Sequence, residues 1–191
     1  MMKIVSPLLI VLAFALTPIN SAQATIRTWA DTDGLFWSNP AGWLLGVVPV
    51  NGDDVIMGTQ SSAASNPVCN FLSTYSGPGL NSLKINATNV GVFTLSQTGS
   101  GSAMIAITEI IGDTISGNVY TQNAGSNTTS SLTLGNGLNG TGTYSISGSG
   151  SLAATSLTVG NAGTGTFTQS GGAVSVTSAL AISQSNVSST S

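Results

Sequence analysis

The fold is decided by two successive stretches, TGTYSISGSGSLAATSLTVGNAG (Thr141–Gly163) and TGTFTQSGGAVSVTSALAIS (Thr164–Ser183), which resemble each other closely. The same period extends toward the N-terminus. An aromatic residue recurs at spacings of 27, 24 and 23 residues, at Phe93, Tyr120, Tyr144 and Phe167. A fixed period of this length indicates one supersecondary unit stacked on copies of itself.

Two further columns follow the same period. The first is apolar and consists of Leu132, Leu157 and Leu180, with partners two residues later at Leu134, Val159 and Ile182. The second is polar and consists of Asn86, Asp113, Asn136 and Asn161. We expect the aromatic and apolar columns to stack inside. We expect the polar column to form a turn ladder, since Asn tolerates turn geometry and its amide can pair with the coil above.

Apolar and polar residues alternate within each unit, in segments such as Tyr144–Ile146, Leu157–Val159 and Leu180–Ile182. Such alternation is typical of strands with one face buried. Gly-rich breaks separate the segments, which predicts three short strands and three bends in each coil. The sequence therefore predicts an all-β fold, a right-handed parallel β-helix (β-solenoid) of about five coils with a Trp-rich N-terminal cap.

The chain divides into three parts. Residues 1–24 have the features of a signal peptide: Lys3, an apolar run from Ile4 to Leu16, and the small-x-small sequence Ala22–Ala24. An N-terminal membrane anchor is the alternative, although the apolar run is short for a span. Residues 25–67 form the capping segment. Residues 68–191 form the solenoid repeats, which stop within a unit, so we expect a fragment of a longer protein.

The capping segment contains all three tryptophans of the chain, and two roles are open for them. They can seal the first coil, whose core would otherwise be exposed. They can also form a stacking platform for glycans. The residues concerned are Trp29, Trp37 and Trp43.

Several single residues carry expectations of their own. Strict alignment places Glu109 in the Leu132 column, and because a lone buried carboxylate is costly, we expect a bulge that turns Glu109 outward. The only cysteine, Cys69, is expected to be buried, since Val68 and Phe71 lie close to it in the sequence. Four N-x-S/T sites fit turns, at Asn86, Asn127, Asn139 and Asn186.

Catalytic chemistry finds little support in the sequence. The chain has no histidine, which excludes Ser-His-Asp and Cys-His nucleophiles and the usual zinc sites. Asp53 and Asp54 are neighbours on an extended segment and would point to opposite faces. Asp31 and Asp33 begin a sequence like a calcium loop, but the remaining ligands do not follow. We therefore expect no catalytic residues, metal ligands or cofactors.

Two binding classes are disfavoured as well. The six acidic and three basic residues give a net charge of −3, so the basic footprint of a nucleic-acid-binding protein is absent. Thr164, Thr166 and Thr168 suggest an ice-binding array, but we expect them to straddle a bend at Gly165 rather than to share one flat face.

Units of the form TGTFTQSGG, followed by a strand and L-x-V-G-N-x-G, resemble the strand repeats of bacterial exported β-solenoid proteins. Those proteins include autotransporter passenger regions and PEP-CTERM-type exoproteins. The stretch from Trp37, WSNPAGW and then VVPVNGDDVIM, is similar to the segment that often precedes such repeats. The resemblance implies export and a location outside the cell or on its outer surface.

These observations predict an exported, non-enzymatic β-solenoid that serves as a structural or adhesive segment. Its partners would be surface glycans or other extracellular polymers. An uncapped C-terminal coil also predicts end-to-end self-association, because the residues after Ile182 are short and polar. The alternative is a carbohydrate-binding module or a polysaccharide-active β-helix enzyme.

The signal sequence leads to the first testable prediction. Cleavage after Ala24 leaves a chain that begins Thr-Ile-Arg-Thr-Trp. N-terminal sequencing of exported protein should read these five residues. Exported protein that retains Met1 would show that residues 1–24 are not a cleaved signal.

Overall fold

The computed structural model describes residues 24–30, 33–58, 66–87, 91–115 and 117–183. The predicted signal peptide lies almost entirely outside these residues. Asp31 and the segment 184–191 lie outside them as well.

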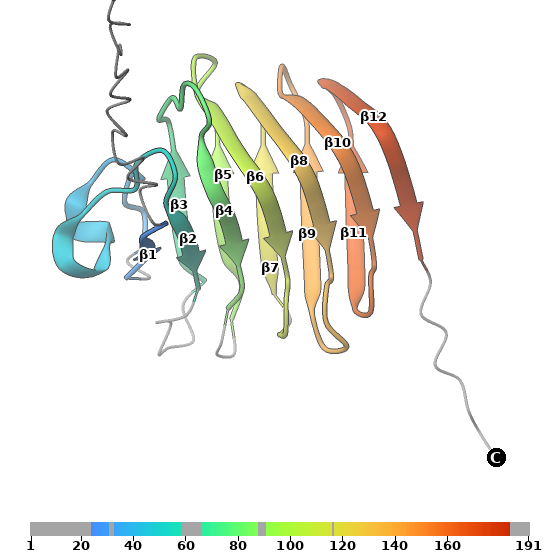
Figure 1. Ribbon diagram of the computed structural model, residues 1–191, viewed down its shortest axis with the longest axis horizontal. Coiled ribbons are helices and arrows are strands. Elements are labelled where there is room, and N and C mark those ends of the chain that lie inside the picture. The colour runs from blue at the N-terminus through green and yellow to red at the C-terminus, as the bar shows by residue number, and fades with distance from the viewer. Residues whose placement is uncertain (1–23, 31–32, 59–65, 88–90, 116, 184–191) are drawn as a thin grey trace, which may run out of the picture.

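The described residues form two parallel β-sheets that face each other (Figure 1). The strand order of the seven-stranded sheet is β1 (Ile26–Thr28), β2 (Asp54–Met57), β4 (Leu80–Ile85), β6 (Ala103–Ile111), β8 (Ser126–Leu134), β10 (Ser151–Val159) and β12 (Ala173–Ile182). The five-stranded sheet consists of β3 (Val68–Phe71), β5 (Phe93–Gln97), β7 (Asn118–Gln122), β9 (Thr141–Ile146) and β11 (Thr164–Gln169).

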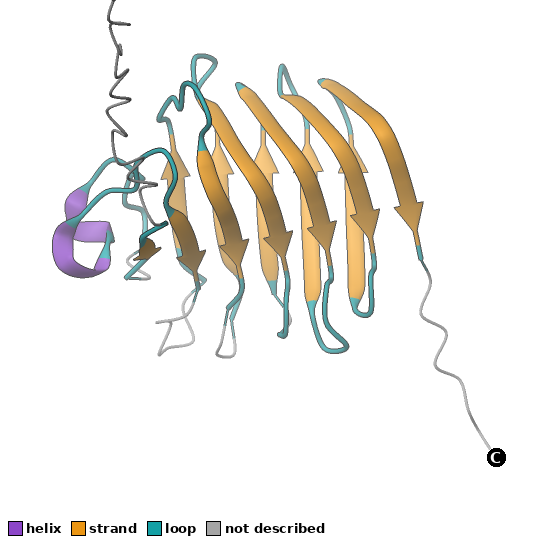
Figure 2. Ribbon diagram, viewed as in Figure 1, coloured by secondary structure: helices purple, strands orange, loops and turns teal. Residues whose placement is uncertain are grey.

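From β2 onward the chain alternates between the two sheets, so each coil gives one strand to each of them. Two short 3₁₀ turns, η1 (Pro40–Gly42) and η2 (Leu44–Gly46), lie beside the first coil (Figure 2). The predicted β-solenoid is therefore confirmed, with about 6 turns. The strands from β3 to β12 make the five coils predicted for residues 68–191, and β1 and β2, within residues 25–67, account for the further turn.

Each full coil contains two strands rather than the three that the sequence predicted. The long strands β6, β8 and β10 continue through a bend. In β8 the buried positions are Asn127, Thr129, Leu132 and Leu134, so the alternation skips one residue in the middle of the strand. Such a change of phase keeps side chains pointing inward on both sides of a bend. One bent strand thus forms two walls of the coil.

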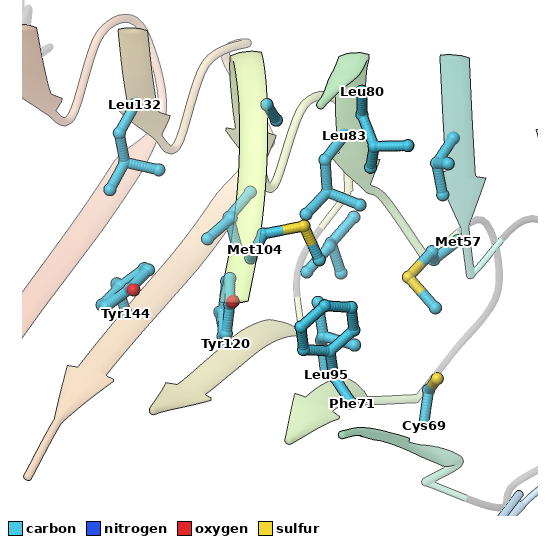
Figure 3. Close-up of a cluster of buried hydrophobic side chains, with 14 of the residues drawn as sticks. Met57, Cys69, Phe71, Leu80, Leu83, Leu95, Met104, Tyr120, Leu132 and Tyr144 are labelled. Atoms are coloured by element: carbon cyan, nitrogen blue, oxygen red, sulfur yellow. The ribbon is translucent and has the colours of Figure 1, made fainter. Parts of the chain in front are cut away.

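The two predicted apolar columns are confirmed by the strand register. Leu132 pairs with Leu157, which pairs with Leu180. In the second column, Leu134 pairs with Val159, which pairs with Ile182. The side chains of these strands and of the five-stranded sheet meet between the two sheets, as Figure 3 shows for ten labelled residues.

The aromatic column differs from the prediction at one position. Tyr120, Tyr144 and Phe167 are in register, with ring centroids 4.7 Å apart for the first pair and 5.8 Å for the second. Phe93 is not part of this column, since it pairs with Asn118, whereas Leu95 pairs with Tyr120. The register partners Leu95 and Tyr120 are 25 residues apart, so the spacing of 27 residues from Phe93 to Tyr120 misplaces the register by two residues.

The predicted turn ladder is present. The Asn161 amide donates to Asn136 Oδ1 over 3.0 Å, and the Asn136 amide donates to Asp113 Oδ1 over 2.6 Å. Asn86 joins differently: its Oδ1 accepts from the backbone N–H groups of Asp113 and Thr114. The ladder thus ties four successive coils together at one edge of the solenoid.

The three tryptophans form the cap and not a glycan platform. Their exposed fractions are 0% for Trp29, 1% for Trp37 and 3% for Trp43. Trp43 packs edge-on against both of the others, with centroid distances of 5.0 and 4.8 Å. Trp37 also packs against Phe71 of the first coil at 5.2 Å. Buried rings cannot stack on a sugar, so the glycan-contact prediction for these residues is wrong.

The aromatic column leads to a test of the coil stacking. Tyr144 is fully buried between two rings, so Tyr144→Ala should reduce the free energy of unfolding by roughly 3–5 kcal/mol. Phe167 is only half-buried because no described coil covers it, so Phe167→Ala should cost less.

The matched control is Thr168→Ala. Thr168 is exposed and follows Phe167 on β11, so its loss should change stability by no more than about 0.5 kcal/mol. Chemical denaturation of the three variants measures this order, and a larger loss for Phe167→Ala than for Tyr144→Ala would contradict the stacking.

Candidate functional site

The outer side of the five-stranded sheet carries an array of hydroxyl groups, which we call the hydroxyl face. Its side chains come from β5, β7, β9 and β11, which form one layer behind the seven-stranded sheet in Figure 1. The residues of the hydroxyl face are Thr94, Ser96, Val119, Thr121, Thr141, Thr143, Ser145, Thr164, Thr166 and Thr168. All but Val119 have a hydroxyl group.

Strand register arranges these side chains in columns across the sheet. One column contains Thr94, Val119, Thr143 and Thr166. A second contains Ser96, Thr121, Ser145 and Thr168. Neighbouring strands lie about 4.8 Å apart and alternate residues along a strand about 6.6 Å apart, so the hydroxyl groups form a regular two-dimensional grid.

Glycines inside the strands make this grid possible. The expected bend at Gly165 is wrong: Gly165 lies within β11, and Thr164, Thr166 and Thr168 all point outward from one strand. Gly142 takes the same place in β9 and is buried. A Cβ atom on Gly142 would overlap the Ile111 carbonyl oxygen of the facing wall. The glycine therefore lets the two walls approach while its neighbours keep their outward direction.

The hydroxyl groups of this face are largely free to bind something else. Thr121 Oγ1 has a contact of 3.5 Å with the Leu95 carbonyl oxygen, which is a weak hydrogen bond. In the described part of the chain, no protein hydrogen bond engages the side chains of Thr143, Thr166 or Thr168. The face also has no charged residue.

The outer side of the seven-stranded sheet is less uniform. Ile107 is 49% exposed there, and a shallow groove of about 160 Å³ lies between Ile105, Thr128 and Thr155. Lys84 projects from β4 and donates to Asp113 Oδ2 over 2.7 Å. The outward positions of β8 and β10 are also mostly Ser and Thr, but β6 beside them places Ile105, Ile107 and Ile110 outward. The outer side of the five-stranded sheet has no such large apolar strand from β5 onward.

The carboxylates lie apart from the hydroxyl face and are engaged in structural contacts. Asp53 Oδ2 accepts from Arg27 Nε over 2.9 Å, and Asp54 Oδ1 accepts from the Asn81 amide over 2.7 Å. Asp53 is buried and Asp54 is half-buried, in agreement with the expectation that they point to opposite faces. Asp33 Oδ1 accepts from the Val68 N–H over 3.0 Å.

Among the described residues, no group of three or more His, Cys, Asp or Glu side chains is placed to hold a metal ion. Cys69 is buried, as expected, and burial raises the pKa of its thiol.

Glu109 does not turn outward, so that expectation is wrong. Its exposed fraction is 0%, and it pairs in register with Leu83 on one side and Leu132 on the other. Asn127 lies one coil on and is also fully buried, in the column of Met104 and Leu152. It is a strand residue of β8 and not a turn residue. Two polar side chains therefore replace apolar ones at adjacent places in the core.

These two residues are partners. The Asn127 amide donates to Glu109 Oε2 over 2.9 Å and to the Tyr144 hydroxyl over 3.1 Å. Glu109 Oε1 and Asn127 Oδ1 have no other partner in the described structure. Burial raises the pKa of Glu109 to about 8, and the bond from Asn127 opposes this rise only in part. A proton on Oε1 makes Glu109 neutral and gives it a donor as well as an acceptor.

Buried glutamines complete this polar layer. The Tyr120 hydroxyl donates to Gln97 Oε1 over 2.8 Å, and the Tyr144 hydroxyl donates to Gln122 Oε1 over 2.7 Å. Each glutamine amide donates to a carbonyl of the adjoining turn, at Ser102 for Gln97 and at Gly125 for Gln122. Each also donates to the first carbonyl of a strand, at Ser126 of β8 and at Ser151 of β10. The sequence analysis missed the glutamines and the role of Asn127, although their in-phase positions within the period could have revealed them.

Comparison with protein-family models, with curated proteins and with solved structures finds no significant match. None of the helices in the described ranges is long and apolar enough to cross a membrane. The candidate site must therefore be judged on its own geometry.

The Glu109–Asn127 pair predicts a pH dependence of stability. The folded-state pKa of about 8 lies above the ordinary value of 4.5, so the folded state binds the proton more tightly. Stability from this group is complete below pH 4.5, falls as the pH rises, and is lost above about pH 8. One proton of difference gives a slope of about 1.4 kcal/mol per pH unit within this window.

Glu109→Gln removes the titrating proton while keeping a donor and an acceptor, so its stability should be nearly constant from pH 5 to pH 8. The opposite dependence of Asp113, whose pKa is lowered first of all by Lys84, acts only at lower pH. Urea denaturation at several pH values compares the two proteins. Parallel curves for Glu109→Gln and the unaltered chain would contradict a protonated Glu109.

Proposed function

We propose that this chain is an exported, non-enzymatic β-solenoid segment that adheres to a neutral, hydroxyl-rich polymer, such as a polysaccharide, through its hydroxyl face. The observation that carries this proposal is the grid of partly exposed Ser and Thr side chains in register on β5, β7, β9 and β11. The grid lies on a continuous parallel sheet, so its spacing is fixed before any ligand arrives.

Adhesion by this face would depend on many weak contacts. A single neutral hydrogen bond contributes only about 1 kcal/mol, but a rigid array pays little ordering entropy when it binds a repeating polymer. Because the face has no charge, the interaction should depend little on salt. This distinguishes the proposed ligand from an anionic polymer, whose binding would weaken steeply with salt.

Export is part of the same proposal. It is supported by the signal features at residues 1–24 and by the resemblance of the repeats to bacterial exported solenoids. The location would be the cell surface or the extracellular space. A long, uncharged Ser/Thr surface is suited to contact with other polymers there.

The alternatives receive less support from the geometry. A carbohydrate-binding module of the tryptophan type needs exposed rings, whereas the three tryptophans are buried in the cap. A polysaccharide-active enzyme needs two carboxyl groups that face one bond across a cleft. The described carboxyl groups lie in separate ion pairs, in turns or, for Glu109, inside the core.

The test compares two matched double variants. Thr143→Val with Thr166→Val removes two adjacent hydroxyl groups from the hydroxyl face, where the two residues are in register. Thr133→Val with Thr158→Val removes two from the other sheet, where the residues are also in register. Both of these are half-buried, like Thr143, whereas Thr166 is exposed. Co-sedimentation with insoluble neutral polysaccharides measures the affinity at low and high salt.

We expect the unaltered chain to bind at least one of these polymers at both salt concentrations. The first double variant should bind roughly thirtyfold more weakly, since two hydrogen bonds are worth about 2 kcal/mol, and the second should bind normally. Equal losses in the two variants, or no binding to any neutral polymer, would overturn the proposal.

A further inference from the structure

The last described coil ends in an apolar surface, which we call the terminal face. It lines a hollow of about 680 Å³ with side chains from β12 and from β10 and β11 beneath it. Leu180 is 60% exposed and Ile182 is 74% exposed, although their counterparts Leu157 and Val159 are buried one coil earlier. Val174, Val176 and Phe167 contribute further apolar surface.

The backbone at this end is also unpaired. Among the described strands, β12 lies at the end of the seven-stranded sheet and pairs only with β10, and β11 lies at the end of the other sheet and pairs only with β9 (Figure 2). Each edge thus presents free N–H and C=O groups to one side. An exposed, ten-residue apolar edge strand such as β12 is a template for pairing with another strand.

The opposite end of the solenoid is a poorer complement for the terminal face. There the segment Gly34–Trp37 runs along β3 and exchanges backbone hydrogen bonds with Val68 and Asn70 over 2.9 Å. The buried Trp cluster fills the core at that end, and the edge of the seven-stranded sheet there is the three-residue strand β1. The ten-residue β12 is matched better by a second terminal face, and such a contact closes on itself as a pair instead of growing into a fibre.

The charge distribution favours the same contact. Every Asp, Glu, Lys and Arg of the chain lies at or before Asp113, so no charged side chain follows in the sequence. Two terminal faces would therefore meet without repulsion between charged side chains. Edge strands that must stay single usually carry a lysine or another charge to prevent pairing, and β12 has none.

The sequence of β12 is matched to itself in an antiparallel pair. If Ser178 lies opposite Ser178 of a second copy, then Val174 lies opposite Ile182 and Val176 opposite Leu180. All four are residues of the terminal face, so this register keeps the four large apolar side chains on the inner side of both strands. Ser178 lies at the bend, where β12 has one residue more than β10. A shift of one residue would place outward side chains against inward ones.

We propose that the terminal face binds the terminal face of a second copy of this chain, with β12 antiparallel to β12, in a closed two-fold dimer. Apart from Thr166, which lines the rim of the terminal face, the residues of the hydroxyl face lie on the outside of the five-stranded sheet and stay accessible. Pairing would align two solenoids end to end and double the length of the polymer-binding surface.

Sedimentation velocity over a concentration series tests the proposal on the purified chain. We expect a monomer–dimer equilibrium with no larger species. Leu180→Lys with Ile182→Lys places charges on the terminal face at positions already exposed, so the coil should stay folded while the dissociation constant rises at least about tenfold. The matched control is Ala181→Lys, which lies between them on β12 and points away from the terminal face.

A second measurement fixes the orientation. Ser178→Cys should be joined to itself by a short bismaleimide crosslinker, whereas Asn51→Cys at the capped end should not. Four results would overturn the proposal: a monomer at every concentration, as when residues 184–191 cover the face; growth into filaments; a dimer that the two lysines leave unchanged; or crosslinking at Asn51→Cys instead of Ser178→Cys. Circular dichroism of each variant confirms that it is folded.

Discussion

Backbone hydrogen bonds between parallel strands hold each coil in register with the next, and the rest of the structure depends on this pairing. β6, β8 and β10 pair residue for residue on both sides of their bends. The nearest inward neighbour of a side chain is therefore its counterpart one coil away. This is why apolar columns form a continuous core from short strands that could not bury a face alone.

The same register determines which hydrogen-bond partners a polar group in the core can reach. A buried polar atom can reach the coil before it, the coil after it, or a carbonyl of the adjoining turn. The tyrosines reach back one coil to a glutamine, and the glutamines reach turn carbonyls. Glu109 has Asn127 one coil away, and its raised pKa follows from burial in a column that is otherwise apolar. Satisfied pairs of this kind can fix register, because a slip would separate the partners.

The two ends and the two outer sides of the solenoid have different characters. The charged residues of the described part of the chain lie at or before Asp113, and Arg27–Asp53 and Lys84–Asp113 form ion pairs. The coils after Asp113 are neutral, and their five-stranded side is covered with hydroxyl groups. The proposed contact along the rod and the proposed association at its open end therefore share only the rim residue Thr166.

The period of the sequence determined the all-β class, the stacking of coils, the apolar columns and the turn ladder, because repeated residues occupy equivalent places in equivalent coils. The period did not determine the strand register where the coils differ in length. Counting placed Phe93 with Tyr120, whereas hydrogen-bond register puts Leu95 there. Local signals also misjudged Gly165, which permits close approach of two walls within a strand instead of ending it.

Only the tertiary structure decided which side chains are buried and which residues they contact. Burial of the tryptophans excludes them from glycan binding, and the partner that Asn127 offers is what permits Glu109 to stay inside. The hydroxyl face could be recognised only once the strands that carry it were placed side by side. Residues far apart in the chain acquire their neighbours from sheet pairing, and a sequence states which residues alternate but not which coil lies against which.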